Sequence, residues 1–171
     1  MYRTFHLIIT IGLLCCITTS CKAQKQLMNS VTKNDMTVNW QYQNDRIHFE
    51  MSAPTDGWVT IGFNTGSGMI GAYLLMGHIV NGHTNIVEHF TSSPGNYQPI
   101  SNYGVPSAVQ NISGREAPKR TTLKFSLPIQ ATSQYQKDLT ENMEYTMILA
   151  FSREDDFQHH SMMRTSVNIK L

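Results

Sequence analysis

Hydrophobic and polar residues alternate with a period of two in the neighbouring segments 36–42 (MTVNWQY) and 47–51 (IHFEM). Successive side chains of a β-strand point to opposite faces, so this alternation predicts two half-buried strands. The polar pair Asn44 and Asp45 lies between the two segments and favours a tight turn. The two segments are therefore predicted to form a β-hairpin.

Six further segments have the composition of strands. Segment 57–63 (GWVTIGF) alternates, whereas segment 72–80 (AYLLMGHIV) is apolar on both faces and is predicted to lie inside a sheet. Asn81 and Gly82, the strongest hairpin signal in the chain, connect it to segment 83–91. The remaining segments are 121–127, 144–151 and 165–171. Many short strands with almost no helix predict an all-β fold, an antiparallel β-sandwich of immunoglobulin-like type.

Two parts of the chain lack this periodicity. Residues 92–118 are rich in Pro, Ser, Asn and Gly and are predicted to form a long irregular loop, which is often functional or mobile. Residues 22–34 are polar and have the character of a tether. The predicted organisation is a signal peptide over 1–20, a tether over 21–34 and one β-sandwich domain over 35–171.

The first twenty residues predict export. Arg3 precedes an apolar run over 7–17, which is too short for an ordinary membrane-spanning helix and is typical of a secretory signal peptide. The sequence TTSC (18–21) resembles a bacterial lipobox, which would make Cys21 the lipid-modified first residue of the mature protein. We therefore expect a lipoprotein of the bacterial cell envelope, on the periplasmic or outer-membrane surface. Simple secretion and an uncleaved anchor are the alternatives.

Cysteine usage and charge exclude several classes of site. The three cysteines, Cys15, Cys16 and Cys21, all fall in this leader, so the mature domain is predicted to have no disulfide and no thiolate metal site. The chain has 13 basic and 12 acidic side chains, and loss of residues 1–20 removes Arg3 but no acid, which leaves a neutral domain. A neutral domain without a basic stripe is not expected to bind nucleic acid.

The sequence does not predict an enzyme. It contains no nucleophile elbow, no glycine-rich phosphate loop and no H-E-x-x-H motif. Three histidines share the hairpin around Asn81, but pairing through this turn sets His78 opposite Asn85. His83 and His89 would then lie about 20 Å apart at the rise of a strand. This spacing is too wide for a three-histidine copper site, and all three histidines are expected to face solvent.

Two loops carry residues that favour cofactor chemistry. Met69 lies among glycines in TGSGMIGA (65–72), and the adjacent His159 and His160 lie in SREDDFQHHSMMR (152–164). A thioether and an imidazole that face each other across an apolar slot are the axial ligands of a low-spin haem. No C-x-x-C-H motif is present, so such a haem would be a non-covalent haem b. The ordinary alternatives are a methionine that fills the core and histidines that face solvent.

These motifs resemble the DOMON domain family. The resemblance lies in GWVTIGFNTGSGMIGAYLLMGHIVNG (57–82) and, about 90 residues later, in ILAFSREDDFQHHSMMR (148–164). It implies a DOMON β-sandwich, and in haem-binding members a methionine after the "GF…G" turn and a histidine before the last strand ligate iron. The matching residues are Met69 and His160, with His159 as the alternative. Other members lack haem and are thought to bind sugars.

Further residues are predicted to contact the haem. Trp58, Phe63 and Tyr73 would flank a porphyrin face, and Arg164 or Lys119 would pair with a propionate. The alternative for the three aromatic residues is a place in the sandwich core. Relatives often carry an acidic residue at the position of Tyr73.

The predicted function is electron transfer by a haem b domain at the cell envelope. Axial ligands on both sides of the iron leave no open position for a substrate, so the expected partner is a redox protein of the envelope, and a lipid anchor would hold the domain at the membrane. The alternative is a ligand-binding module without redox chemistry, which binds carbohydrate or senses haem. Residues 92–118, with Tyr97 and Tyr103, would then hold the ligand.

Overall fold

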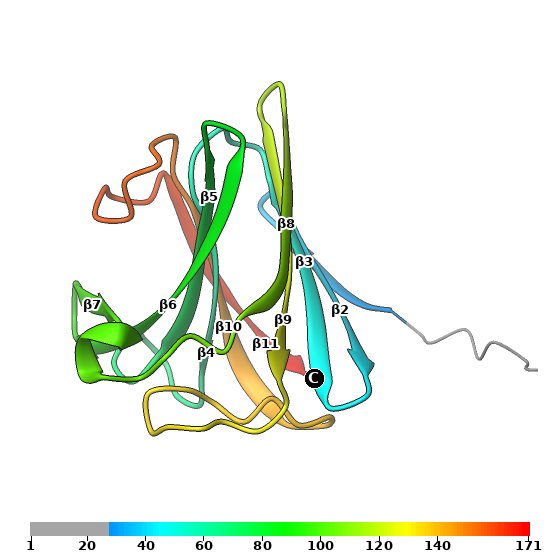
Figure 1. Ribbon diagram of the computed structural model, residues 1–171, viewed down its shortest axis with the longest axis vertical. Helices are drawn as coiled ribbons and strands as arrows, with labels where there is room; N and C mark the ends of the chain where they lie inside the picture. Colours follow the sequence, from blue (N-terminus) through cyan, green and yellow to red (C-terminus); the bar gives the residue numbers. More distant parts are fainter. Residues whose placement is uncertain (1–27) are drawn as a thin grey trace, which may run out of the picture.

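In the computed structural model, which describes residues 28–171, the chain forms two antiparallel sheets packed face to face (Figure 1). The first sheet has the strand order β1-β2-β3-β9-β8 and the second has the order β11-β10-β4-β5-β6-β7. The first consists of β1 (Asn29–Lys33), β2 (Met36–Gln43), β3 (Arg46–Ala53), β8 (Gln110–Ala117) and β9 (Arg120–Pro128). The second consists of β4 (Val59–Asn64), β5 (Tyr73–Val80), β6 (His83–Ser93), β7 (Asn96–Pro99), β10 (Glu144–Phe151) and β11 (Met163–Lys170). The predicted antiparallel β-sandwich is confirmed.

Local turn chemistry sets the register of the predicted hairpins. Asn44 adopts a φ of 57° in the turn between β2 and β3, a left-handed conformation that asparagine tolerates. Asn81 and Gly82 have φ values of 52° and 76°, as a two-residue hairpin turn requires. The resulting register pairs His78 with Asn85, as predicted, and places β5 between β4 and β6.

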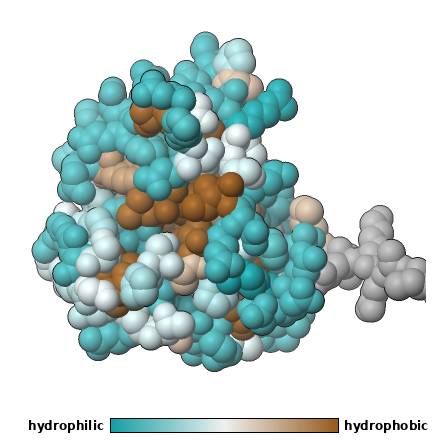
Figure 2. Space-filling model, in the orientation of Figure 1, coloured by the Kyte–Doolittle hydropathy of each residue, from teal (hydrophilic) through white to brown (hydrophobic). Residues whose placement is uncertain are grey.

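The core lies between the two sheets and is built from alternate residues of the strands. The ring of Phe49 lies 5.5 Å from that of Phe125 and 5.6 Å from that of Phe63, which joins the two sheets. Tyr145 meets Phe63 edge to face at 5.7 Å. Figure 2 shows hydrophobic residues in the middle of this view, surrounded by a largely hydrophilic surface. Aromatic packing therefore holds the sandwich together without disulfides among the described residues.

Phe63 and Tyr73 belong to this core, so the prediction that they flank a porphyrin is wrong. The two residues are register partners on β4 and β5, with exposed fractions of 0% and 2%. The period of a strand explains the error, because Phe63 shares the inner face of β4 with Val59 and Ile61. The alternative, a place in the sandwich core, is the one found.

The structure contains strands where the sequence predicts a tether and a loop. Residues 29–33 form β1, which pairs along its whole length with β2. Residues 92–118 contain the end of β6, then β7, a short 3-10 helix η1 (Ile100–Tyr103) and β8. Both β1 and β8 are exposed on nearly all residues, so no hydrophobic alternation marks them. The signal peptide and Cys21 lie outside the described residues.

Within residues 28–171, no helix has both the length and the apolar character needed to cross a membrane.

Candidate functional site

The outer face of the six-stranded sheet, which points away from the sandwich core, is apolar. A second cluster of buried hydrophobic residues lies on it, separate from the core: Trp58, Ala72, Leu74, Met76, Ile148 and Ala150. The outer face of an antiparallel sheet commonly faces water and is polar. Instead, Met69, Tyr97 and Phe157 pack partly over this cluster. An apolar outer face that loops cover only in part is typical of a ligand site.

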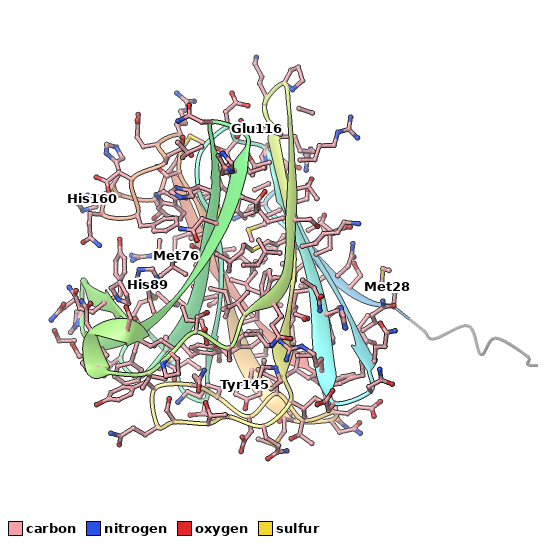
Figure 3. All side chains as sticks on the ribbon, viewed as in Figure 1. Met28, Met76, His89, Glu116, Tyr145 and His160 are labelled. Carbon is pink, nitrogen blue, oxygen red and sulfur yellow. The ribbon has the colours of Figure 1, made fainter. Side chains whose placement is uncertain are left out.

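A cleft with about 760 Å³ of space, including its open mouth, lies over this face. Its floor consists of Trp58, Thr60, Leu74, Met76, Ile148 and Ala150. Its rim includes Met69 from loop 65–72, Tyr97 from β7, His160 from loop 152–162 and Arg164 from β11. Figure 3 shows Met76, His89 and His160 on the same side of the six-stranded sheet, away from the five-stranded sheet. The part of this space that a water molecule can enter is about 190 Å³, below the roughly 300–1,000 Å³ that is usual for sites of organic ligands, so a large planar ligand would extend through the open mouth.

Gly62 leaves room for the side chain of Leu74 in the floor of the cleft, because glycine has no side chain of its own. Gly62 lies on the outer face of β4, and a Cβ there would approach Leu74 Cδ2 to 2.4 Å and Ile148 Cβ to 3.4 Å. The side chain of Leu74 therefore occupies the space that a larger residue at position 62 would fill. An apolar floor of this kind suits an apolar or aromatic part of a ligand.

Hydrogen bonds hold the loop that carries Met69. The side-chain amide of Asn64 donates to the carbonyls of Gly68 and Ile70, at 3.1 and 3.0 Å. Gly68 has a φ of +92°, which L-residues rarely adopt, so glycine is required there for backbone reasons. The carbonyl of Met69 accepts a hydrogen bond from Ala72 at 3.0 Å. Met69 is thus half-buried on a constrained turn beside the cleft.

Loop 152–162 carries His160 to the opposite rim. The hydroxyl of Ser152 donates to the carbonyl of His160 at 3.2 Å, and Met162 N–H donates to the carbonyl of Phe151 at 2.9 Å. His160 is exposed and lines the cleft, whereas the exposed His159 is not among the residues that line it. Met69 and His160 therefore come to one cleft from loops about 90 residues apart.

Phe157 fixes the middle of loop 152–162 to the sheet. Its carbonyl accepts a hydrogen bond from the hydroxyl of Tyr97, and its ring stacks on that of His78 with centroids 4.4 Å apart. His78 Nδ1 also contacts the carbonyl of Asp155 at 2.7 Å. The loop is thus attached to β5 and β7 as well as to the strands that precede and follow it.

His89 lies beneath Phe157, so the prediction that it faces solvent is wrong. Its exposed fraction is 1%, and its ring meets that of Phe157 edge to face at 5.7 Å. Burial lowers the pKa of His89, because the charged imidazolium is poorly solvated there, although a hydrogen bond to the carbonyl of Val87 acts in the opposite direction. The pKa of Tyr97 is raised by burial and by the nearby carboxylate of Asp156.

Two buried polar atoms in the cleft floor have no hydrogen-bond partner among the described residues. They are Trp58 Nε1 and Thr60 Oγ1, and both side chains are 3% exposed. Most buried polar atoms in proteins are hydrogen-bonded. These two atoms therefore point to a polar group of a ligand, or to water, in the cleft.

The cleft brings together four of the residues predicted from sequence: Met69, His160, Trp58 and Arg164. Lys119 is not among the residues that line the cleft. It lies in the turn between β8 and β9, where its backbone N–H donates a hydrogen bond to Asp56 Oδ1 at 2.8 Å. Thr60 was not predicted at this site, and Tyr97 was predicted only as a ligand contact of the alternative binding module without redox chemistry. Thr60 is one polar residue in an apolar strand, so it left no clear signal. Within residues 28–171, no group of three or more His, Cys, Asp or Glu side chains is placed so that it could hold a metal ion.

Comparisons with known proteins agree with this architecture. The model of the DOMON domain family matches residues 32–152. The mouse (Mus musculus) DBH-like monooxygenase protein 1 is 21% identical over 140 residues, which are 78% of this chain but only 22% of that protein. The chain therefore spans about a fifth of this relative.

Two solved structures share the fold. The cytochrome b domain of pyranose dehydrogenase from Coprinopsis cinerea has a TM-score of 0.60 and 12% identity, over 84% of this chain and 81% of that one. The cytochrome domain of cellobiose dehydrogenase from Myriococcum thermophilum has a TM-score of 0.56 and 9% identity, over 86% and 90%. At these identities the likeness establishes the fold alone.

Proposed function

This chain belongs to the DOMON domain family, and from that premise we propose that it binds haem b non-covalently in the cleft and transfers single electrons. The observation that carries the proposal is that Met69 and His160, from distant loops, line one cleft over an apolar sheet face. A thioether and an imidazole are the donor set of low-spin cytochromes. The similarity to two cytochrome domains supports the same function.

The residues of the cleft fit this group in three respects. The donor set is correct for iron in a porphyrin. The floor is apolar, and Leu74 fills the space over Gly62. The unpartnered Trp58 Nε1 and Thr60 Oγ1 supply hydrogen-bonding capacity that a purely apolar ligand would leave unused.

Each part of the site has a separate role in the proposed function. Met69 and His160 would hold the iron, while the apolar floor residues would exclude water from the buried edge of the ring. Bound haem b supplies a one-electron couple at its iron. Because Met69 and His160 would both ligate the iron, the site would offer no open position to a substrate, so we propose no catalytic reaction. Ligation by a thioether favours the reduced iron and raises the reduction potential.

The proposed setting is the bacterial cell envelope. Cys21, outside the described residues, would carry the lipid that holds the domain at the membrane, and an envelope redox protein would exchange electrons with it. A domain held at a membrane by a polar segment encounters partners at the same surface more often than a free one.

The visible spectrum of the full-length protein, produced with haem available, tests the proposal. We expect a Soret band and, after reduction, the sharp α and β bands of low-spin iron. Met69→Leu and His160→Gln should each convert the iron to a high-spin form or release the haem, whereas the neighbouring His159→Gln should keep the low-spin spectrum. A colourless protein, or low-spin spectra in both cleft variants, would overturn the proposal.

A further inference from the structure

The floor of the cleft has a polar end and an apolar end. At one end lie Trp58 and Thr60, whose Nε1 and Oγ1 atoms are buried and unpartnered among the described residues. Two residues further along β4, the row across the sheet is Leu74, Gly62 and Ile148, which carries no polar side chain. A ligand with both polar and apolar edges would therefore bind in a defined orientation.

Strand register brings a cation to the polar end. Thr60 pairs with Ala150, and Ala150 pairs with Arg164, so the three residues form one row across β4, β10 and β11. Adjacent strands lie about 4.8 Å apart, so Arg164 and Thr60 flank the small side chain of Ala150 at roughly twice that spacing. A long arginine side chain reaches across such a distance, and Arg164 lines the same cleft.

The chemistry of these groups selects a carboxylate. The indole N–H of Trp58 and the guanidinium of Arg164 are donors only, and the hydroxyl of Thr60 can donate. No acidic side chain is among the residues that line the cleft, so these donors have no negatively charged acceptor within it. Several donors around one point, one of them a cation, suit an acceptor that carries a negative charge.

We infer that Trp58, Thr60 and Arg164 form a subsite for a carboxylate group of the bound ligand. On the proposed function, on which this inference rests, the group is a haem propionate that points to the β4–β10 end of the cleft. The subsite then fixes which edge of the porphyrin lies deepest, in addition to the iron ligands at the rim.

Titration of the full-length protein with haem b and with its dimethyl ester tests this subsite. The two ligands share the iron and the ring, but the ester has no carboxylate. Thr60→Val keeps the shape of the side chain and removes the hydroxyl, and we expect it to weaken haem b binding by about ten-fold, the usual effect of a hydrogen bond to a charged group. Binding of the dimethyl ester should stay within about two-fold of that of the unaltered protein, because the ester makes no such bond.

Thr91→Val is the matched control. Thr91 Oγ1 is also buried and unpartnered among the described residues, but Thr91 is not among the residues that line the cleft. Both substitutions should raise the melting temperature of the ligand-free protein, because each removes a buried hydroxyl without a partner. Only Thr60→Val should weaken haem b binding. Trp58→Phe should likewise weaken the binding of haem b but not of its dimethyl ester. This variant gives a second test if Thr60→Val folds poorly.

The outcomes separate this inference from the proposed function. If the unaltered protein binds neither porphyrin, the proposed function fails. If it binds haem b but Thr60→Val and Trp58→Phe bind it equally well, only the subsite is wrong, and water satisfies the two atoms. Equal weakening of haem b and its ester would likewise overturn the subsite, because it would indicate lost packing.

Discussion

The hydroxyl of Tyr97 on β7 donates a hydrogen bond to the carbonyl of Phe157, in the middle of loop 152–162. This bond joins β7, an edge strand of the six-stranded sheet, to the loop that carries His160. Only two residues lie between Phe157 and His160, so a shift of one changes the position of the other. Tyr97 therefore acts on the proposed haem through the backbone, as a positioning residue.

Tyr97→Phe should loosen the His160 side of the site without loss of the fold. A neutral hydrogen bond contributes about 0.5–1.5 kcal/mol, so we expect haem dissociation to accelerate by about two- to ten-fold. The measurement is the rate of haem transfer to an excess of an apo-globin, together with the high-spin fraction in the visible spectrum. Tyr103→Phe is the control, because Tyr103 stacks on Tyr135 and is not among the cleft residues. Equal rates for the two variants would show that the bond does not position His160.

Gly62→Ala should reduce haem affinity by displacing a side chain of the cleft floor. The new Cβ would lie 2.4 Å from Leu74 Cδ2, so the side chain of Leu74 must move. The open space beside it is the cleft, which Leu74 lines, so we expect it to move outward into the cleft. Overpacking of this kind costs about 1–3 kcal/mol. Gly66→Ala is the control, since no atom lies within 4 Å of a Cβ there.

A double variant tests the mechanism of that effect. Leu74→Ala removes the atom that clashes, so Gly62→Ala combined with Leu74→Ala should bind haem better than Gly62→Ala alone. Residues in direct contact couple by about 0.5–3 kcal/mol in such cycles. Additive losses in affinity, measured by haem titration of all four proteins, would contradict the proposed clash.

The strands that bury at least one face were predictable from sequence, and the strands that bury neither face were not. In β2 and β3 buried residues alternate with more exposed ones, so the sequence itself carries the period of two. In β8 seven of eight residues are exposed, and backbone pairing with β9 alone makes it a strand. Such pairing depends on the neighbouring strand, and no pattern within 110–117 reports it.

The cleft was predictable only in part, for a similar reason. The glycines around Met69 and the paired histidines before the last strand are local features, and they mark both rims. The burial of His89 is not local, because Phe157 from a loop some 70 residues later covers it. Phe63 and Tyr73 show the converse error: aromatic character predicts burial but not which face of the sheet receives it.

Glu88 should be important for stability and unimportant for haem ligation. Its buried carboxylate accepts hydrogen bonds from Tyr73 Oη at 2.5 Å, Gln136 Nε2 at 2.8 Å, Ser107 Oγ at 2.7 Å and the N–H of Ala108 at 2.7 Å. Glu88→Ala leaves these donors unpaired, and we expect a loss of about 3–5 kcal/mol of unfolding free energy, measured with urea.

The spectrum and a surface pair provide the controls for Glu88. Because Glu88 lies on the inner face of β6, folded Glu88→Ala should keep the low-spin spectrum at low temperature. Glu50→Ala breaks the pair with Lys124, whose ammonium is 2.6 Å from Glu50 Oε2 but largely exposed, and should cost less than about 1 kcal/mol. Equal losses in the two variants would mean that the Glu88 network contributes little.

The buried His89 should make the ligand-free protein less stable in mild acid. The pKa of His89 in the folded protein is below the ordinary histidine value of 6.5, so the unfolded chain takes up a proton at a higher pH than the folded one. The contribution of neutral His89 to the unfolding free energy should therefore be fully present above about pH 6.5. It should decrease as the pH falls from 6.5 toward the lower pKa of the folded protein. Urea unfolding between pH 5 and 8 measures this dependence.

His89→Asn, which cannot titrate, isolates this contribution. The variant should be less stable at pH 8, because asparagine does not reproduce the ring contacts with Phe157 and Tyr97, but its stability should change less between pH 8 and pH 5. His48→Asn is a suitable control, since His48 lies on β3 in the other sheet and is partly exposed. If His89→Asn keeps the full pH dependence of the unaltered protein, then the acid sensitivity arises elsewhere, and the region beneath Phe157 must admit enough water to solvate a charged imidazole.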